Sequence, residues 1–176
     1  MLEELKRKIA HYLIKKKYLR HSPEAIAFKS VIKDAKEVFV IMPFNEVDFA
    51  DSLELVKYFH IHKKDITIFL SEGRQSSVPL SHNYKFFSFL PVQISRFFLP
   101  DKMLIARLKE KYYDLVIDLN RQEDTFFSCV ANVVKSKVRI GFRKNRSEDY
   151  YNLLFESRLN ENSSAYKRLL EHLSMF

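Results

Sequence analysis

Polar side chains follow four apolar runs of the chain, each at the point where the run ends. They are Asn45 and Asp48 after residues 38–42, Arg74 after 65–70, Asn120 and Arg121 after 114–119, and Arg143 and Lys144 after 138–142. If these runs are parallel strands, the side chains collect outside the carboxyl ends of the strands, where open α/β sheets bind their ligands. The sequence therefore predicts a polar ligand site of mixed charge at this edge.

One member of this set could do acid–base chemistry. The carboxylate of Asp48 could take the proton of a hydroxyl group that comes within hydrogen-bond reach. A structural role is the alternative, because Asp48 stands three residues after Asn45, a residue suited to cap a helix. A carboxylate in the first turn of a helix contributes about 0.3–1 kcal/mol of stability. The sequence leaves both roles open.

Charge is concentrated in residues 1–20, which hold seven basic and two acidic residues. Their net charge of +5 makes up most of the +8 of the whole chain. The basic residues are Lys6, Arg7, Lys8, Lys15, Lys16, Lys17 and Arg20. Apolar residues recur between them at spacings near three and four, which predicts an amphipathic helix: Leu2, Leu5, Ile9, Tyr12 and Leu13.

This basic helix has several interpretations. It could attach to an acidic protein partner or to an anionic membrane surface, where each Lys or Arg contributes about 1 kcal/mol. It could instead dock on the domain through Leu2, Leu5 and Ile9, with its lysines in water. Nucleic acid is a further partner that charge alone would allow, but no recognised binding motif supports it.

Composition excludes several classes of site. The chain has only two glycines, Gly73 and Gly141, whereas a phosphate-binding loop needs several. Cys129 is the only cysteine, so neither an internal disulfide nor a multi-cysteine zinc site can form. The six histidines show no ligand spacing. We therefore predict no metal site and no cofactor.

The sequence also contains features that bear on where in the cell the protein is located. No stretch approaches the roughly 18 apolar residues that a membrane span requires. Charges run through the N-terminus, where a secretory signal would have an apolar core. These features predict a cytoplasmic protein, which the basic helix could hold at the inner face of the cytoplasmic membrane.

The elements that would position the polar residues alternate between strand and helix. Apolar runs rich in β-branched residues, typical of strands covered on both faces, predict strands over 38–42, 65–70, 114–119 and 138–142, with 84–89 as a further candidate. Helical spacing predicts helices over 23–35, 45–60, 101–111, 125–134 and 164–173, the third with Met103, Leu104 and Leu108 inward. The alternation predicts a Rossmann-like α/β fold, with a mostly parallel sheet and helices on both faces. We expect a basic amphipathic helix over 1–22 and a single domain over 23–176.

Part of this pattern resembles a known family. The run Tyr-Asp-Leu-Val-Ile-Asp-Leu at 113–119, then a helix, then Arg-Ile-Gly-Phe at 139–142, resembles the N-terminal domain of glycosyltransferase family 9, the heptosyltransferase family. The resemblance covers about residues 36–174. It implies a Rossmann-like fold and sets Asp48 at the position of the family's proposed catalytic base. It also implies that a nucleotide-sugar donor, typically ADP-heptose, would bind in a second domain, which this sequence does not contain.

The sequence departs from the family at several of these positions. Val47 stands where the family has Gly, and Met42 where members often have Arg. Asn120 and Arg121 replace a Gln or His followed by Gly. These departures fall on the residues that would carry the chemistry.

Three functional hypotheses follow. The first is a bacterial, non-catalytic, heptosyltransferase-like protein that acts as a binding or accessory subunit and has a protein partner. The second is the acceptor-binding half of a glycosyltransferase of lipopolysaccharide or cell-envelope assembly, completed by a separate donor-binding chain. The third is a structural subunit of a larger assembly, which uses the basic helix and the Phe-rich segment 84–99 as contacts. For that segment, we predict that at least two Phe side chains are accessible to solvent.

Overall fold

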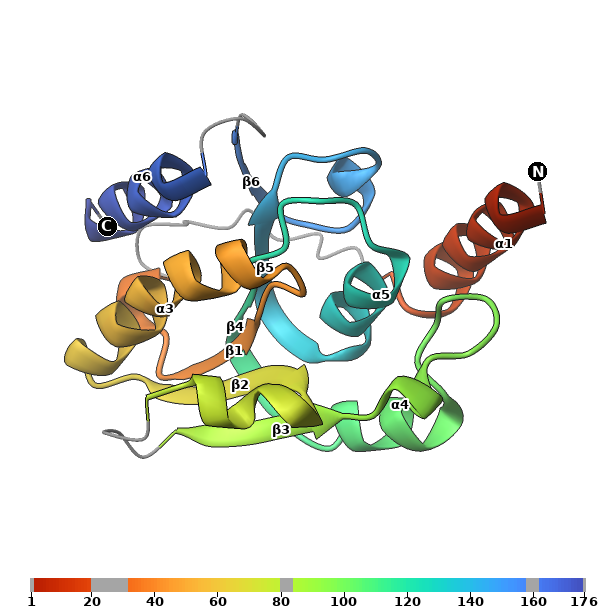
Figure 1. Cartoon of the computed structure of the whole chain (residues 1–176), viewed down its shortest axis with the longest axis horizontal. Helices are drawn as coiled ribbons and strands as arrows, with labels where there is room; N and C mark the ends of the chain where they lie inside the picture. Colours follow the sequence, from red (N-terminus) through yellow and green to blue (C-terminus); the bar gives the residue numbers. More distant parts are fainter. Residues whose placement is uncertain (1, 20–31, 80–83, 158–161, 176) are drawn as a thin grey trace.

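A six-stranded parallel sheet forms the centre of the molecule (Figure 1). The computed structural model describes residues 2–19, 32–79, 84–157 and 162–175, with the side chains of 162–164 left out. The strands are β1 (Glu37–Ile41), β2 (Asp65–Ser71), β3 (Lys85–Phe89), β4 (Tyr112–Asp118), β5 (Lys135–Phe142) and β6 (Leu153–Phe155). Their order is β3-β2-β1-β4-β5-β6, and each neighbouring pair is parallel. The predicted Rossmann-like fold is confirmed.

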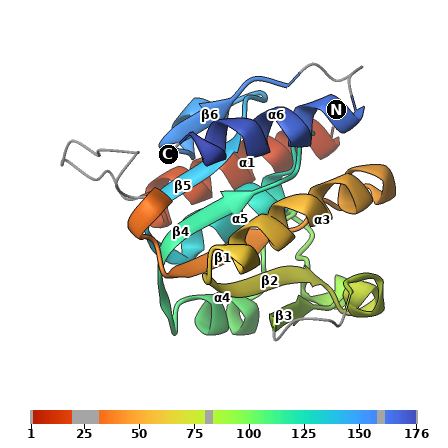
Figure 2. The same cartoon turned by 90° about the vertical axis from the view of Figure 1, so that its left-hand side faces the viewer.

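Helices cover both faces of this sheet. α3 (Glu46–Ile61) and α6 (Asn162–Ser174) pack on one face, and α1 (Leu2–Lys17), α4 (Lys102–Leu108) and α5 (Thr125–Val133) lie on the other (Figure 2). Three short 3-10 helices, η1 (Glu72–Ser77), η2 (Pro91–Gln93) and η3 (Ser147–Asp149), lie in the connections. The helix predicted over 23–35 falls largely outside the described residues, and residues 32–34 are helical.

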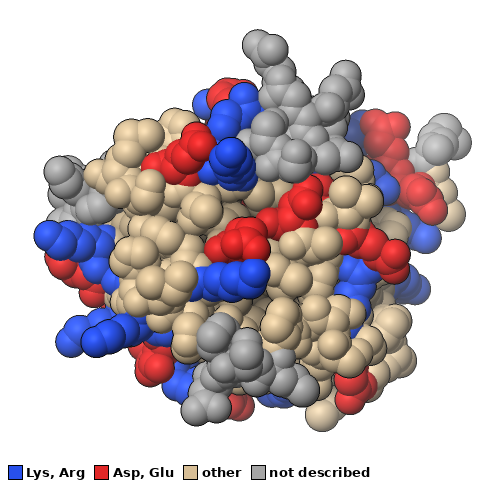
Figure 3. Space-filling view, turned by 60° about the vertical axis from the view of Figure 1, so that its left-hand side comes forward, with Lys and Arg blue, Asp and Glu red and all other residues tan. Residues whose placement is uncertain are grey.

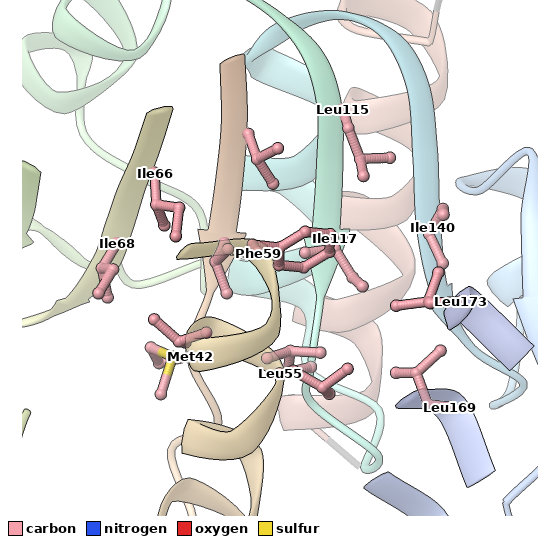
Figure 4. Packing of buried hydrophobic residues seen from close by; sticks show 14 of the residues in the cluster. Met42, Leu55, Phe59, Ile66, Ile68, Leu115, Ile117, Ile140, Leu169 and Leu173 are labelled. Carbon is pink, nitrogen blue, oxygen red and sulfur yellow. The ribbon is translucent and has the colours of Figure 1, made fainter. Parts of the chain in front are cut away.

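Alternation of side chains along each strand builds two cores. In β1, Val38 and Val40 belong to the core beneath α3 and α6, whereas Phe39 and Ile41 belong to the core beneath α4 and α5. Strands of this kind are apolar throughout because both of their faces are covered. Figure 4 shows the first core, in which Leu55, Phe59, Leu169 and Leu173 of the two helices meet Ile66, Ile68, Leu115, Ile117 and Ile140 of the strands.

Several boundaries differ from those predicted. α4 ends at Leu108 rather than at 111, because the chain must leave the helix to enter β4 at Tyr112. Met103 is exposed, contrary to prediction, since Leu104 and Leu108, one turn apart, already fill the inward face. β5 begins at Lys135, three residues earlier than expected. β6 was not predicted, because three residues are too few for a periodic pattern.

The N-terminal helix docks on the domain, but not through the residues that its apolar stripe indicated. Ala10 and Ile14 have no exposed surface, and His11 is buried with them. Leu2, Leu5 and Ile9 are exposed, so the predicted docking through these side chains is wrong. The apolar stripe does not mark the docking face, because Ala10, His11 and Ile14 lie on the opposite side of the helix. Arg20 lies outside the described residues.

The Phe-rich segment 84–99 lies partly at the surface. In the Phe-rich segment, Phe86, Phe87, Phe97 and Phe98 are partly exposed and Phe89 is buried, which confirms the predicted accessibility. On the side where α3 and α6 lie, acidic and basic side chains are interspersed among uncharged ones (Figure 3). Within the described residues, no helix combines the length and the apolar character needed to cross a bilayer.

Candidate functional site

A polar hollow opens where the order of the strands reverses, between β1 and β4. We call it the carboxyl-edge pocket. It encloses about 200 Å³ and is lined by the loops that follow the two strands, through Pro43, Phe44, Asn45, Asp48, Asn120, Arg121, Gln122, Glu123 and Asp124. This reversal is the topological switch point, at which doubly wound sheets bind ligands.

Two helices begin at the pocket, and both N-termini are already capped. The Asn45 side chain accepts hydrogen bonds from the backbone N–H groups of Val47 and Asp48 at 2.9 and 3.2 Å, as its position in the sequence predicted. The Asp124 side chain does the same for Phe126 and Phe127 at the start of α5, at 2.8 and 3.3 Å. Burial raises the pKa of Asp124, and the two backbone bonds oppose that rise. Since these donors already have acceptors, the helix ends are not free to bind an anion.

The predicted base, Asp48, is held by an arginine. Its Oδ1 accepts hydrogen bonds from Nε and Nη2 of Arg121, at 3.0 and 2.8 Å. Asp48 is 4% exposed and Arg121 is 7% exposed. The guanidinium also lies over the ring of Tyr166, whose hydroxyl donates to the carbonyl of Leu119 at 2.8 Å. This pair ties the loop after β4 to the first turn of α3.

A second buried carboxylate, Asp118, lies behind the pocket at the end of β4. It has no exposed surface. The ammonium of Lys144 is 2.7 Å from its Oδ2, and the Tyr151 hydroxyl donates to the same oxygen. Burial is the main reason that the pKa of Tyr151 is well above its usual range, and the negative charge of Asp118 raises this pKa further. Asp118 therefore joins β4 to the chain that follows β5.

Gly141 makes this second cluster possible. It lies beside Asp118 in the register of β4 and β5, and the ring of Tyr151 packs directly over it. A Cβ at this position would lie 2.9 Å from two carbons of that ring. Glycine is required here because the phenol must approach the strand closely to reach Asp118.

Asn120 connects the loops on the two sides of the switch point. Its Nδ2 donates to Oδ1 of Asp118 at 2.8 Å and to the carbonyl of Met42 at 3.3 Å. Its Oδ1 accepts from the backbone N–H of Phe44 at 3.0 Å. The side chain thus fixes the loop after β1 against the end of β4, which sets the shape of the pocket floor.

Glu123, one of the residues that line the carboxyl-edge pocket, contacts the N-terminal helix α1. Glu123 Oε1 lies 3.3 Å from Nε2 of His11, and Nδ1 of the same ring is hydrogen-bonded to the Tyr150 hydroxyl. Burial lowers the pKa of His11, an effect that the charge of Arg146 reinforces and that of Glu123 opposes. α1 is therefore coupled to the pocket through one buried histidine.

The structure brings together most of the predicted site. Asn45, Asp48, Asn120 and Arg121 all line the pocket, and Lys144 reaches the carbonyl of Asn120 from behind at 2.9 Å. Arg74 lies at the rim, where it donates to the carbonyl of Pro43 at 3.2 Å and stacks over Phe44.

One predicted member does not join the site. Arg143 forms ion pairs with Glu148 and Glu156 on the exposed side of the β5 end. Arg143 follows the end of β5 and is held on the β6 side, where its backbone N–H donates to the carbonyl of Phe155 at 2.7 Å.

Sequence reasoning missed Glu123, Asp118 and Tyr151. A signal existed for Asp118, a carboxylate directly after the apolar run Leu115–Ile117, because a charge buried there needs a partner. Among the residues that the structure describes, no group of three or more His, Cys, Asp or Glu could hold a metal ion.

Comparison with known proteins assigns the chain to a family. The sequence profile of DUF6913, a family of unknown function, matches residues 6–176, so the chain belongs to this family. The comparison with curated proteins found no match, and neither did the comparison with solved structures. The resemblance to glycosyltransferase family 9 stays a prediction.

Proposed function

We propose that this member of the DUF6913 family is a non-catalytic, heptosyltransferase-like binding or accessory protein that holds an uncharged sugar in the carboxyl-edge pocket. The ion pair between Asp48 and Arg121 carries the proposal. Asp48, which the resemblance sets at the position of the base proposed for glycosyltransferase family 9, has a structural partner inside the protein. With 4% of its surface exposed, Asp48 offers little access to an incoming hydroxyl, which a general base would need within about 2.6–3.2 Å.

The chemistry of the lining favours a neutral polyol over a phosphate. The pocket has three carboxylates, Asp48, Glu123 and Asp124, against one guanidinium. Phosphate groups prefer free helix N-termini and basic side chains, whereas both helix ends here are capped. The amides of Asn45 and Gln122 can both donate to and accept from sugar hydroxyls, and the carboxylate of Glu123 can accept from them.

The alternative is that the same pocket holds the acceptor sugar of a transferase completed by a separate donor-binding chain. The polar lining supports an acceptor equally well. The two functions differ in whether a partner chain brings sugar transfer, so affinity purification from the native cell, followed by turnover assays on the complex, separates them. In both cases we expect a protein partner and a site of action in the cytoplasm.

Sugar binding is tested by ligand-observed NMR of the purified chain with free neutral monosaccharides, heptoses included. We expect saturation transfer from the protein to at least one of them. Gln122→Ala should reduce the signal, because Gln122 is an exposed amide of the lining. Asn145→Ala is the matched control, since Asn145 is an exposed amide outside the lining. Transfer that is the same in both variants would contradict the assignment of the pocket.

A further inference from the structure

The N-terminal helix is fixed in one orientation on the domain. Ala10, His11 and Ile14 form its buried face, and the Lys15 ammonium lies 2.7 Å from Oδ2 of Asp149. The guanidinium of Arg7 lies over the Phe98 ring, 5.7 Å from its centroid. Contacts on this one side, spread over more than two turns, hold the opposite face of α1 outward.

The outward face is apolar. Leu2, Leu5, Ile9 and Tyr12 recur at intervals of three and four residues, so they lie in one stripe along the helix. Their exposed fractions are 67%, 54%, 38% and 61%. An apolar stripe normally faces the core of a protein, but here the core contact is made by a different face.

Basic side chains border the stripe. At 100° per residue, Lys6 and Lys8 fall on opposite flanks of Leu5 and Ile9, and Lys16 lies over the ring of Tyr12 at 5.8 Å. Over its whole length α1 has six basic and two acidic residues, a formal net charge of +4 with His neutral. The side of the molecule that carries α3 and α6 has charges of both signs interspersed (Figure 3).

We propose that α1 binds the surface of an anionic lipid bilayer through this stripe, lying in the plane of the interface. The stripe would enter the boundary between headgroups and acyl chains, and the flanking lysines would extend to the lipid phosphates. Charge complementarity selects an anionic surface, and the apolar stripe selects a bilayer over nucleic acid, because phosphate-backbone contacts need only the cations.

This mode of attachment would put the carboxyl-edge pocket near the bilayer. Glu123, which lines the pocket, meets His11 on the buried face of α1, opposite the stripe. A helix with its side chains is about 10–12 Å across. The side of the pocket formed by Glu123 would therefore lie about one helix diameter (~10 Å) from the lipid surface.

Flotation of the full chain with two kinds of vesicle tests the proposal. We expect binding to phosphatidylcholine mixed with phosphatidylglycerol and little binding to phosphatidylcholine alone. The variant Leu5→Gln/Ile9→Gln/Tyr12→Gln should lower the partition coefficient on anionic vesicles by at least about tenfold, because it removes most of the buried apolar area. Lys6→Gln/Lys8→Gln/Lys16→Gln should lower it by a similar factor, and high salt should reproduce that loss.

Two matched controls separate α1 from the rest of the surface. Val92→Gln/Met103→Gln removes exposed apolar side chains elsewhere, and Lys57→Gln/Lys85→Gln/Lys102→Gln removes three exposed lysines elsewhere. Both should bind as the wild type does. All variants change exposed or partly exposed side chains, so thermal unfolding should be unchanged and would reveal any that misfold. The proposal is overturned if the wild type does not float with anionic vesicles, if the stripe variant floats as well as the wild type, or if the chain binds nucleic acid through the lysines independently of the stripe.

Discussion

Asp48 and Asp118 are two buried carboxylates at the same edge of the sheet, and each is paired with a basic side chain, yet their surroundings differ. Asp118 has no exposed surface and is shared by Lys144, Tyr151 and Asn120. Asp48 lines the carboxyl-edge pocket and is bound by Arg121. Asp118 thus stabilises three converging segments, whereas the charge of Asp48 stands beside a space that a ligand can enter. Charged residues at a strand end are therefore not equivalent candidates for function.

The largest expected effect comes from removing Asp118. Asp118→Ala leaves the buried ammonium of Lys144 without its carboxylate, so the free energy of unfolding should fall by about 3–5 kcal/mol. Urea denaturation followed by circular dichroism measures the change. As a control, Glu54→Ala breaks the exposed ion pair with Lys57 and should change stability by less than about 1 kcal/mol. Equal effects of the two substitutions would contradict the stabilising role of the buried carboxylate of Asp118.

Gly141→Ala should be the next most damaging. The new Cβ would meet the Tyr151 ring at 2.9 Å and push the phenol away from Asp118. We expect a loss of about 1–3 kcal/mol, as for other overpacked cores. Gly73→Ala is the control, because a Cβ there meets nothing within 4 Å. If the two alanines have the same effect, close approach of Tyr151 is not the reason for glycine at 141.

Asp48→Asn should cost less than Asp118→Ala. It removes the charge that faces Arg121 but keeps an oxygen that can accept a hydrogen bond, and the pocket lets water approach. We expect a loss of about 1–3 kcal/mol in the free energy of unfolding. If Asp48→Asn destabilises the protein more than Asp118→Ala does, the prediction that Asp118 contributes more to stability than Asp48 is wrong.

The smallest effect concerns the link between the pocket and α1. The pKa of His11 in the folded chain lies below its ordinary value of 6.5, so the unfolded chain binds the proton first as the pH falls. Stability should therefore decline as the pH drops below 6.5, by at most about 1.4 kcal/mol per pH unit from this group. His11→Gln should flatten the profile in that window, while His172→Gln, at an exposed position, should leave it unchanged. A wild-type profile that rises toward acid pH would rule out this coupling.

The fold was accessible from the sequence because the apolar runs have both faces covered. Residues 38–41 and 115–117 are entirely apolar, and the alternation of such runs with helical segments leaves few topologies. The strand ends then located Asn45, Asp48, Asn120 and Arg121 together, since parallel strands end at one edge. β6 and the docking face of α1 were beyond reach, because three residues give no pattern and because the contact of Ala10, His11 and Ile14 depends on tertiary structure.

The chemistry of the site was harder to predict than its place. Its place after a strand and the resemblance to glycosyltransferase family 9 made Asp48 a candidate base, but neither contains information on the side chain that would face it. Arg121 is 73 residues away along the chain and meets Asp48 only after β1 and β4 pair. The role of Lys144 could not be predicted either, since Lys144 follows β5 whereas its partner Asp118 ends β4.

The most direct test of a binding pocket without transferase chemistry is a titration of the isotope-labelled chain by NMR. The side-chain amide signals of Asn45, Asn120 and Gln122 are followed while a free heptose, and separately ADP-heptose, is added. We predict saturable shifts of the Asn45 and Gln122 amides with the free sugar, no tighter binding of ADP-heptose, and no turnover of the nucleotide sugar. Tighter, saturable binding of ADP-heptose that is lost in Asp48→Ala would contradict this account and favour an enzyme.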